Sequence, residues 1–313
     1  MTRVAAVDCG TNSIRLLVAD VDQATGTLTD LDRRMEIVRL GQGVDETGRF
    51  AVAALDRTFA ALAAYARTIR ELDAGRVRMV ATSATRDVAN RADFVAGVED
   101  ILGVPPEVVS GDEEAALSFA GVAPELAGAG VAEPYLVVDI GGGSTEFVLG
   151  TAAGVKAARS VDIGCVRMTE RHFRGADPPT PEQVAAARAD IDAGIDLAGR
   201  DVPLDEARTL AGLAGTVTTV AGTALGLPAY DPAVIHFSRI AAGEVRGVAA
   251  RLLAMTHEER ARIPVMHPGR VDVIGAGALI LAAIVDWLPV DEVVVSEHDI
   301  LDGIAWSLAG RER

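Results

Sequence analysis

The stretch YLVVDIGGGSTEFVL, residues 135–149, decides the fold of this 313-residue chain. Residues 135–139 and 145–149 are apolar enough for two buried strands, and a run of three glycines separates them. Glycines let the backbone turn sharply and come close to a ligand. The pattern predicts a strand, a tight turn and a second strand, with turn amides that can point into one concavity and hold an anion.

A second stretch of the same construction opens the chain. Residues 3–8 and 14–20 are predicted strands, and the turn between them is Gly10-Thr11-Asn12-Ser13. Either loop alone is as readily an ordinary hairpin as a phosphate site. Two similar loops, one opening each half of the chain, favour phosphate binding. The glycines at 141–143 lack the spacing of a dinucleotide fingerprint and the Gly-Lys-Ser/Thr ending of a P-loop.

The remaining pattern alternates strands and helices, which predicts an α/β fold in two domains. Small residues and a proline at 128–134 make this segment the expected linker. The expected domains are residues 1–127 plus 299–313, and residues 128–298. Further strands are expected at 35–40, 77–81, 108–109, 155–161 and 292–296, and helices at 51–73, 90–102, from 111 onward, 165–172, 181–198, 217–225, 243–253, 256–262, 272–287 and 299–309.

Composition sets the bounds on function. The formal net charge of −16 argues against broad nucleic-acid binding and requires any phosphate site to create its own positive potential. No apolar run approaches the ~20 residues of a membrane span, and the first residues do not resemble a signal peptide, so we expect a cytoplasmic protein without a membrane partner. Two cysteines are expected to be small buried residues. The five histidines show no metal-ligand spacing and are assigned no chemistry.

Several polar residues admit two interpretations. Asp139 and Glu146 flank the second turn, where a carboxylate can hold Mg²⁺ against phosphate. The pair Glu113-Glu114 opens a helix, where acids complement the helix dipole whether or not they act in catalysis. Arg86 is suited to a phosphate contact or to an ion pair. The Gly215-Thr216 step precedes a helix, so it either attracts phosphate or provides a cap.

Five motifs then occur in order along nearly the whole chain, and together they resemble the exopolyphosphatase/guanosine pentaphosphate phosphohydrolase (Ppx/GppA) family in its short two-domain form. Any one motif is moderately specific, and the ordered set is very specific. The motifs are DCGTNSIR at 8–15, TSATRDVAN at 82–90, SGDEEA at 110–115, DIGGGSTE at 139–146 and GLAGT at 212–216.

The resemblance implies an actin-like fold of the sugar kinase, heat-shock chaperone and actin type. Two lobes, each with a mixed sheet of about five strands flanked by helices, would enclose a cleft. It also implies Mg²⁺-dependent hydrolysis, with Mn²⁺ as an alternative, of the terminal phosphoanhydride of inorganic polyphosphate. The family's catalytic glutamate falls on Glu114 and its metal-side acids on Asp139, Glu146 and Asp8. The expected phosphate-binding residues are Gly10, Thr11, Asn12, Ser13, Arg86, Gly141, Gly142, Gly143, Ser144, Thr145, Gly215 and Thr216.

The chain departs from the family at one position. Many relatives have Arg two residues after the catalytic Glu, and this chain has Ala116. The missing contact and the short length predict a preference for shorter polyphosphate chains. Three other functions use the same fold: guanosine pentaphosphate 5′-phosphohydrolase, a kinase, and a non-catalytic sensor of phosphate chains or alarmones. A homodimer is expected from the resemblance.

Overall fold

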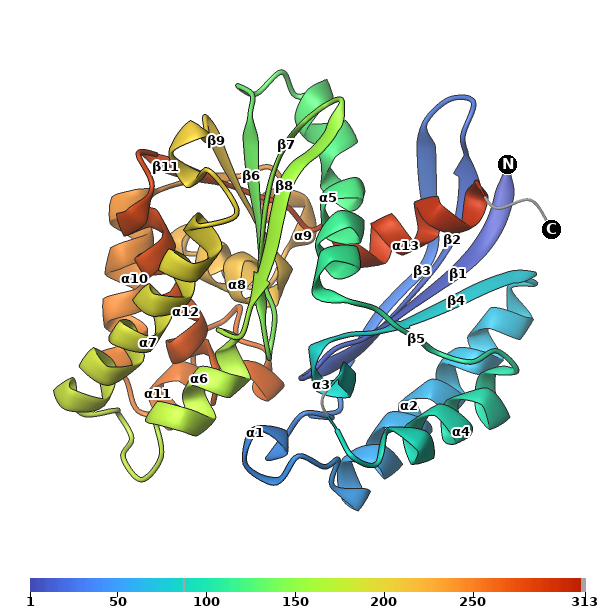
Figure 1. Cartoon of the computed structure of the whole chain (residues 1–313), viewed down its shortest axis with the longest axis horizontal. Helices are drawn as coiled ribbons and strands as arrows, with labels where there is room; N and C mark the ends of the chain where they lie inside the picture. Colours follow the sequence, from blue (N-terminus) through green and yellow to red (C-terminus); the bar gives the residue numbers. More distant parts are fainter. Residues whose placement is uncertain (87, 311–313) are drawn as a thin grey trace. The chain divides into compact units, whose positions relative to one another are not determined.

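The computed structural model describes residues 1–86 and 88–310, and Figure 1 draws its elements along the chain. The chain forms two compact units, Met1–Val122 with Asp299–Arg313, and Ala123–His298. The chain first crosses from one unit to the other inside helix α5 (Gly111–Gly128), between Val122 and Ala123. This point is earlier than the linker expected at 128–134. Of the quoted motifs, only Asp87 lies outside the described residues.

The first unit contains a five-stranded mixed sheet in the order β3-β2-β1-β4-β5. Strands β1, β2 and β3 are antiparallel neighbours, while β4 and β5 continue from β1 in parallel. Besides α5, its elements are β1 (Thr2–Cys9), β2 (Ser13–Asp22), β3 (Thr27–Ile37), α1 (Val44–Thr47), α2 (Val52–Glu71), β4 (Arg76–Ala81), α3 (Ser83–Arg86), α4 (Arg91–Leu102), β5 (Glu107–Val108) and α13 (Ile300–Ala309).

The second unit contains a six-stranded sheet in the order β10-β11-β9-β6-β7-β8. Its elements are β6 (Tyr135–Ile140), β7 (Thr145–Thr151), β8 (Gly154–Val161), α6 (Cys165–His172), α7 (Pro181–Gly199), β9 (Thr209–Leu213), α8 (Ala214–Ala224), α9 (Pro232–Ile235), β10 (Arg239–Ala241), α10 (Ala242–Ala254), α11 (His257–Ala261), α12 (Ile274–Trp287) and β11 (Glu292–Val295).

The two sheets repeat one topology. Strands β8, β7 and β6 are antiparallel neighbours, and β9 and β11 continue in parallel, as in the first unit; β10 adds an antiparallel edge. The internal repeat expected from residues 3–20 and 135–149 is therefore a repeat of whole sheets. The predicted α/β class with two mixed, helix-flanked sheets is confirmed.

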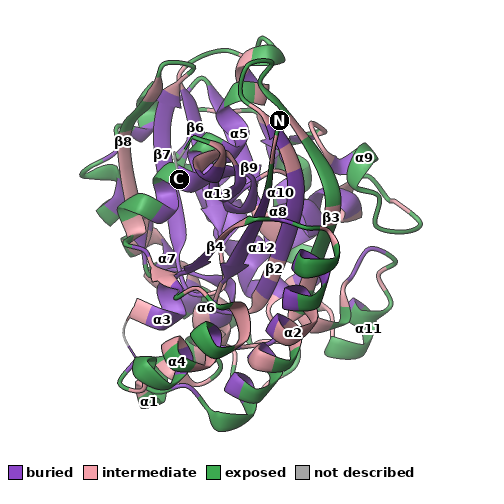
Figure 2. Cartoon of the chain, turned by 90° about the vertical axis from the view of Figure 1, so that its right-hand side faces the viewer, coloured by how far each residue is buried: buried purple, intermediate pink, exposed green. Residues whose placement is uncertain are grey.

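Helices cover both faces of the first sheet. Residues of α2 and α4 pack on one face, and α13 with Leu117 of α5 packs on the other. In the second unit, α12 is the central helix, and its residues 274–285 are all buried. Figure 2 shows the strands as mostly buried and the outer faces of α1, α4 and α11 as largely exposed. These rigid sheets fix the loops at the strand ends.

One predicted strand was misplaced. The strand expected at 35–40 runs instead over β3 (Thr27–Ile37), whose residues are mostly exposed or half-buried. Runs of apolar residues indicate buried strands, and this edge strand contains no such run. Val38 and Leu40 are apolar because they pack in the core beyond the strand. The short strand β10 was not predicted.

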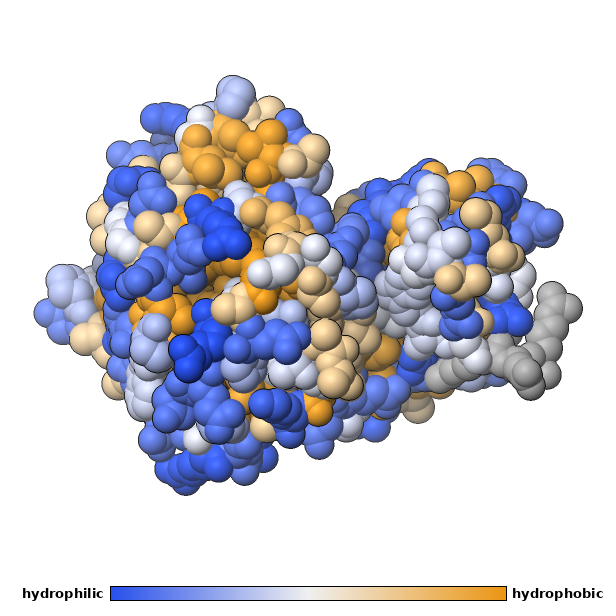
Figure 3. All heavy atoms as spheres, turned by 90° about the horizontal axis from the view of Figure 1, so that it is seen from above, coloured by the Kyte–Doolittle hydropathy of each residue, from blue (hydrophilic) through white to orange (hydrophobic). Residues whose placement is uncertain are grey.

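The surface is mainly polar. On the face drawn in Figure 3, hydrophilic residues surround smaller hydrophobic areas. Among residues 1–86 and 88–310, no helix combines the length and the hydropathy that a membrane crossing requires. Both cysteines are buried and free, as expected.

Candidate active site

The first glycine-punctuated loop is a turn held from behind by its own unit. The amide of Gly10 donates to the Ser13 carbonyl at 2.9 Å. The carbonyl of Thr11 accepts from Gly41 at 2.8 Å, and that of Asn12 accepts from the amides of residues 38 and 39 at 3.1 and 2.8 Å. A trans peptide places its N–H opposite its C=O. The amides of Asn12 and Ser13 therefore point away from the 38–41 segment, on the side where an anion can be bound.

The second loop repeats this construction in the other unit. Gly141 donates to the Ser144 carbonyl at 3.0 Å, with the same spacing as Gly10 and Ser13. The first turn of α6 holds the loop carbonyls: residues 165–167 donate to the carbonyls of Gly141 and Gly142 at 2.9–3.1 Å, and Arg167 Nε donates to that of Gly143 at 2.7 Å. By the same planarity, the amides of Gly142, Gly143 and Ser144 point away from α6.

The hydroxyls of both loops serve mainly to position the loops. Thr11 Oγ1 lies 2.9 Å from Ser83 Oγ, which ties the first loop to the start of α3. Thr145 Oγ1 donates to the Ile163 carbonyl at 2.5 Å, and Ser144 Oγ donates to Glu146 at 2.7 Å. Backbone amides are thus the donors that both loops have in common for an anion. The contribution of these hydroxyls to phosphate binding stays a prediction.

Glu114 is buried in the first turn of α5 and bound by Arg86. Arg86 Nη1 donates to Glu114 Oε2 at 2.6 Å and to the Val109 carbonyl at 3.3 Å. Burial raises the pKa of Glu114, and the charge of Arg86 offsets only part of that rise. Of the two interpretations of Arg86, the structure contains the ion pair. The neighbouring Glu113 is half-exposed and pairs with Arg78 at 2.7 Å, so the two glutamates have different environments.

Asp8 is the next-to-last residue of the central strand β1 and lies beside Arg15, which ends the first motif and had been given no role. Arg15, opposite Asp8 in the ladder, donates to Asp8 Oδ2 at 3.0 and 2.8 Å and also pairs with Asp299. Burial raises the pKa of Asp8. Burial also acts on Asp299, but Arg15, the Leu301 amide and Arg33 together outweigh it and hold the pKa of Asp299 below its ordinary value. Asp8 Oδ1 is buried and has no hydrogen-bond partner among the described residues.

Asp139 and Glu146 are the corresponding acids of the second unit. They are directly opposed across the β6–β7 ladder, and both are buried. Directly opposed residues of an antiparallel pair lie on one face of the sheet, where like charges destabilise each other. The Glu146 Oε1 atom accepts from Ser144 and Ser160, both at 2.7 Å. Carboxylate oxygens of this kind are the donors Mg²⁺ takes, so these residues fit the expected cation.

The Gly215-Thr216 step lies in the first turn of α8, where Gly215 is half-buried and Thr216 is buried. A Cβ atom added at Gly215 would lie 2.2 Å from the guanidinium of Arg270, so the arginine would have to shift if residue 215 carried a side chain. Thr216 is buried beside Gly277, and the hydroxyl does not cap α8. Arg270 is thus the positive group next to this step. Sequence analysis missed it because it lies 55 positions from Gly215 with no motif around it.

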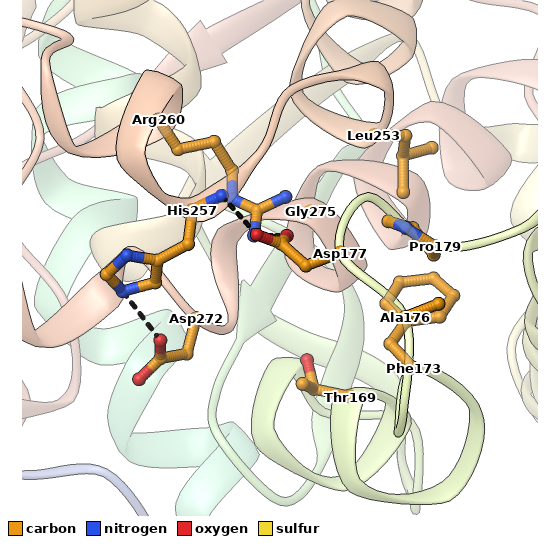
Figure 4. Close-up of a pocket in the computed structure, with 10 residues that line it drawn as sticks. All are labelled: Thr169, Phe173, Ala176, Asp177, Pro179, Leu253, His257, Arg260, Asp272 and Gly275. Carbon is orange, nitrogen blue, oxygen red and sulfur yellow. Dashed lines mark hydrogen bonds and ion pairs between the residues drawn. The ribbon is translucent and has the colours of Figure 1, made fainter.

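A pocket of about 260 Å³ lies elsewhere in the second unit, between α6, the segment 173–179, α10, α11 and the start of α12. Figure 4 shows its lining, with Arg260 directed at Asp177 and His257 at Asp272. Arg260 is buried and also donates to three backbone carbonyls, so its role here is to hold the surrounding backbone segments together. No predicted site residue lines this pocket, so we do not assign the phosphate chemistry to it.

The chain as a whole is similar to known proteins. The family model described as the Ppx/GppA phosphatase family matches residues 17–312. The chain is 53% identical to Exopolyphosphatase 2 of Mycobacterium tuberculosis over 99% of each protein. Similarity at this level over the whole length extends well beyond the quoted motifs.

Solved structures agree with the sequence comparison. A crystal structure of an exopolyphosphatase-like protein superposes with a TM-score of 0.92 at 43% identity, covering 97% of this chain and 98% of that one. The Ppx/GppA enzyme of Aquifex aeolicus superposes with a TM-score of 0.81 at 31% identity, covering 98% and 99%. The resemblance expected from the five motifs is confirmed, and this chain belongs to the Ppx/GppA phosphatase family.

Proposed function

We propose that this protein is an exopolyphosphatase that uses Mg²⁺ to hydrolyse the terminal phosphoanhydride bond of inorganic polyphosphate and release orthophosphate. The observation that carries the proposal is the buried Glu114, held by Arg86 at 2.6 Å and set apart from the solvated Glu113. Membership of a phosphatase family and the name of the Mycobacterium tuberculosis relative support it.

Glu114 acts as the general base. It accepts a proton from water while the water oxygen attacks the terminal phosphorus in line with the bridging oxygen. The bond to that bridging oxygen breaks, so one orthophosphate leaves and the chain is shorter by one phosphate. The directed amides of the two loops bind non-bridging oxygens, and most of the rate comes from positioning and charge stabilisation. Arg86 positions Glu114 and keeps the carboxylate ionised.

Asp139, Glu146 and Asp8 would hold the divalent cation, which supplies charge neutralisation at the phosphates and a template for them. Two structural features support this assignment. Asp139 and Glu146 are buried and opposed on one sheet face, and Asp8 Oδ1 is a buried oxygen without a hydrogen-bond donor. Mg²⁺ suits such oxygen ligands, and Mn²⁺ can replace it.

The test compares two adjacent glutamates. Glu114→Gln should reduce phosphate release from polyphosphate at least ~10²-fold, because it removes a general base without changing the side-chain shape. Glu113→Gln should stay within about twofold of the parent enzyme, because Glu113 is half-exposed and pairs with Arg78. Orthophosphate release is measured with Mg²⁺ at saturating and limiting substrate, and circular dichroism checks that both variants fold.

The same assay separates the substrates. Tripolyphosphate, long-chain polyphosphate and guanosine pentaphosphate are compared in parallel with the parent protein. We expect the highest kcat/KM with short polyphosphate. If guanosine pentaphosphate is hydrolysed faster than either polyphosphate, the protein is an alarmone phosphohydrolase. If ADP forms from ATP with a small acceptor, it is a kinase, and if substrates bind without turnover, it is a sensor. Unchanged phosphate release by Glu114→Gln would overturn the catalytic assignment.

A further inference from the structure

Two histidines and a glutamate that are far apart in the sequence meet in the second unit. Glu125 lies near the end of α5, His236 follows α9, and His298 follows β11. Glu125 Oε1 lies 2.8 Å from His298 Nδ1, and Glu125 Oε2 lies 3.3 Å from His236 Nε2. The two imidazole rings have centroids 4.8 Å apart, and one nitrogen or oxygen from each residue falls within 4.8 Å of the other two.

We propose that Glu125, His236 and His298 form a binding site for a divalent transition metal of the zinc type, separate from the phosphate loops. Two imidazole nitrogens and one carboxylate are a ligand set that zinc uses, with a further position left open. In a tetrahedral zinc site with bonds of about 2.0–2.1 Å, neighbouring ligand atoms are about 3.3 Å apart. The measured contacts with Glu125 are close to that spacing.

A buried oxygen without a hydrogen bond provides a second argument. Glu125 Oε2 is inaccessible to solvent and has no hydrogen-bond partner among the described residues, even though His236 Nε2 is 3.3 Å away. A buried carboxylate oxygen normally accepts a hydrogen bond or coordinates a cation. The three side chains themselves are 26–37% exposed, so an ion can enter.

The local backbone holds both histidines in place. Ser296 is buried and bonds His298 on both sides: its hydroxyl donates to the His298 carbonyl at 2.8 Å and accepts from the His298 amide at 3.0 Å. Phe237 has a left-handed backbone, with φ of 58°, and its amide binds the Val295 carbonyl at 2.7 Å. A bulky residue keeps such a conformation only when its surroundings enforce it. The ligands are therefore largely pre-positioned.

Metal binding changes one hydrogen bond. The Glu297 amide donates to His236 Nδ1 at 3.2 Å, so without metal the ring carries its proton on Nε2. Coordination through Nε2 would place the ring proton on Nδ1, so the Glu297 amide would lose its acceptor there. One long hydrogen bond is exchanged for a coordination bond. This exchange also distinguishes a metal site from a histidine–carboxylate cluster that only shares protons.

The test is zinc binding to the full chain. The protein is treated with chelator and titrated with Zn²⁺ by calorimetry in millimolar Mg²⁺, which occupies oxygen-ligand sites. We expect one Zn²⁺ per chain, an absorbance band typical of tetrahedral coordination when Co²⁺ replaces it, and a Tm raised by Zn²⁺. Glu125→Gln and His298→Asn should each weaken Zn²⁺ binding at least tenfold and remove the Tm shift.

His257→Asn is the matched control. His257 is also a half-exposed histidine of the second unit, paired with Asp272 at 3.0 Å, but it lies outside the cluster (Figure 4). Its variant should bind Zn²⁺ as the parent does. Absence of saturable one-to-one binding overturns the proposal and leaves a proton-sharing cluster. Equal binding by parent and cluster variants also overturns it, because the Zn²⁺ would then be held elsewhere. Neither outcome depends on phosphatase activity.

Discussion

A carboxylate that accepts a proton from water works best when its pKa lies above that of a free glutamate, which is about 4.3. Glu114 has this property because burial disfavours the charged form. Arg86 at 2.6 Å acts in the opposite direction and favours the ionised carboxylate. The balance between burial and the arginine therefore sets the pH at which the proposed base loses its proton.

The pH dependence of Arg86→Met tests this balance. A base must be deprotonated, so activity falls as the pH drops through the pKa of Glu114. Removing the guanidinium removes an effect that lowers the pKa of Glu114, so the acid limb of kcat/KM should move to higher pH. Initial rates between about pH 5 and 9 measure it. Glu113→Gln should leave the limb in place, and an acid limb that moves to lower pH in Arg86→Met would contradict the assignment.

The candidate residues could be predicted from sequence where a short motif carried them. Gly141–Ser144 and Glu114 stand in motifs, so their positions were predicted. Arg15 ends the first motif but was given no role, and Arg270 was not singled out, because an arginine in a strand or loop has no chemical signature of its own. The histidines were assigned no chemistry and Glu125 was not singled out, since residues more than 60 positions apart are brought together only by the fold of the second unit.

At the scale of elements, each phosphate loop depends on a glycine behind it. A Cβ atom at Gly164 would lie 2.3–2.5 Å from backbone atoms of Gly142 and Gly143. A Cβ atom at Gly41 would lie 2.3 Å from Thr11 Cγ2, which belongs to a side chain. Backbone in a tight turn cannot yield as a side chain can. Neither requirement can be inferred from the loop motifs, since both glycines lie outside them.

The two glycines should therefore respond differently to alanine. Gly164→Ala displaces the second loop and should lower kcat/KM for polyphosphate at least ~10-fold, because small shifts of a positioned group are costly to catalysis. Gly41→Ala requires mainly a rotation of Thr11 and should cost less. Steady-state kinetics of the two variants measure the difference. If kcat/KM falls equally in both variants, Thr11 cannot move away from residue 41 and the expected difference is wrong.

The contact between α5 and α13 in the first unit also depends on glycine. A Cβ atom at Gly303 would lie 2.0 Å from the Leu117 carbonyl oxygen, and one at Gly121 would lie 1.9 Å from that of Asp299. Gly303→Ala should destabilise the protein by about 1–3 kcal/mol through overpacking, in spite of the better helix propensity of alanine. Gly247→Ala in α10, where space is open, should be neutral or slightly stabilising. Urea unfolding midpoints compare them.

At the scale of the whole molecule, the sequence predicted a repeat of two α/β units, and the sheets follow the same strand order in both. Apolar strands and glycine turns carry that information locally. The passage inside α5 was missed because a helix that continues from one unit into the next shows no break in composition at residues 122–123. The expected cleft, homodimer and cytoplasmic location stay predictions.

Net charge leads to a prediction about substrate length. The chain carries a formal charge of −16, and polyphosphate is a polyanion, so the protein as a whole repels its proposed substrate while local amides and arginines attract the terminal phosphate. The Debye length, over which charges still interact, is about 30 Å at 0.01 M salt and about 10 Å at 0.1 M. Raising ionic strength over that range weakens long-range repulsion more than short-range attraction. kcat/KM for long-chain polyphosphate should therefore rise several-fold, and that for tripolyphosphate should rise less.

The measurement uses initial rates at fixed free Mg²⁺, with potassium and tetramethylammonium chlorides compared to separate general screening from binding of one cation. If kcat/KM for long chains falls as salt is added, an extended positive surface attracts the chain and outweighs the net charge. Ala116→Arg offers an internal comparison at an exposed position of α5, two residues after Glu114. The added charge should lower KM for long chains and reduce their gain from salt, because it offsets part of the repulsion next to the proposed base.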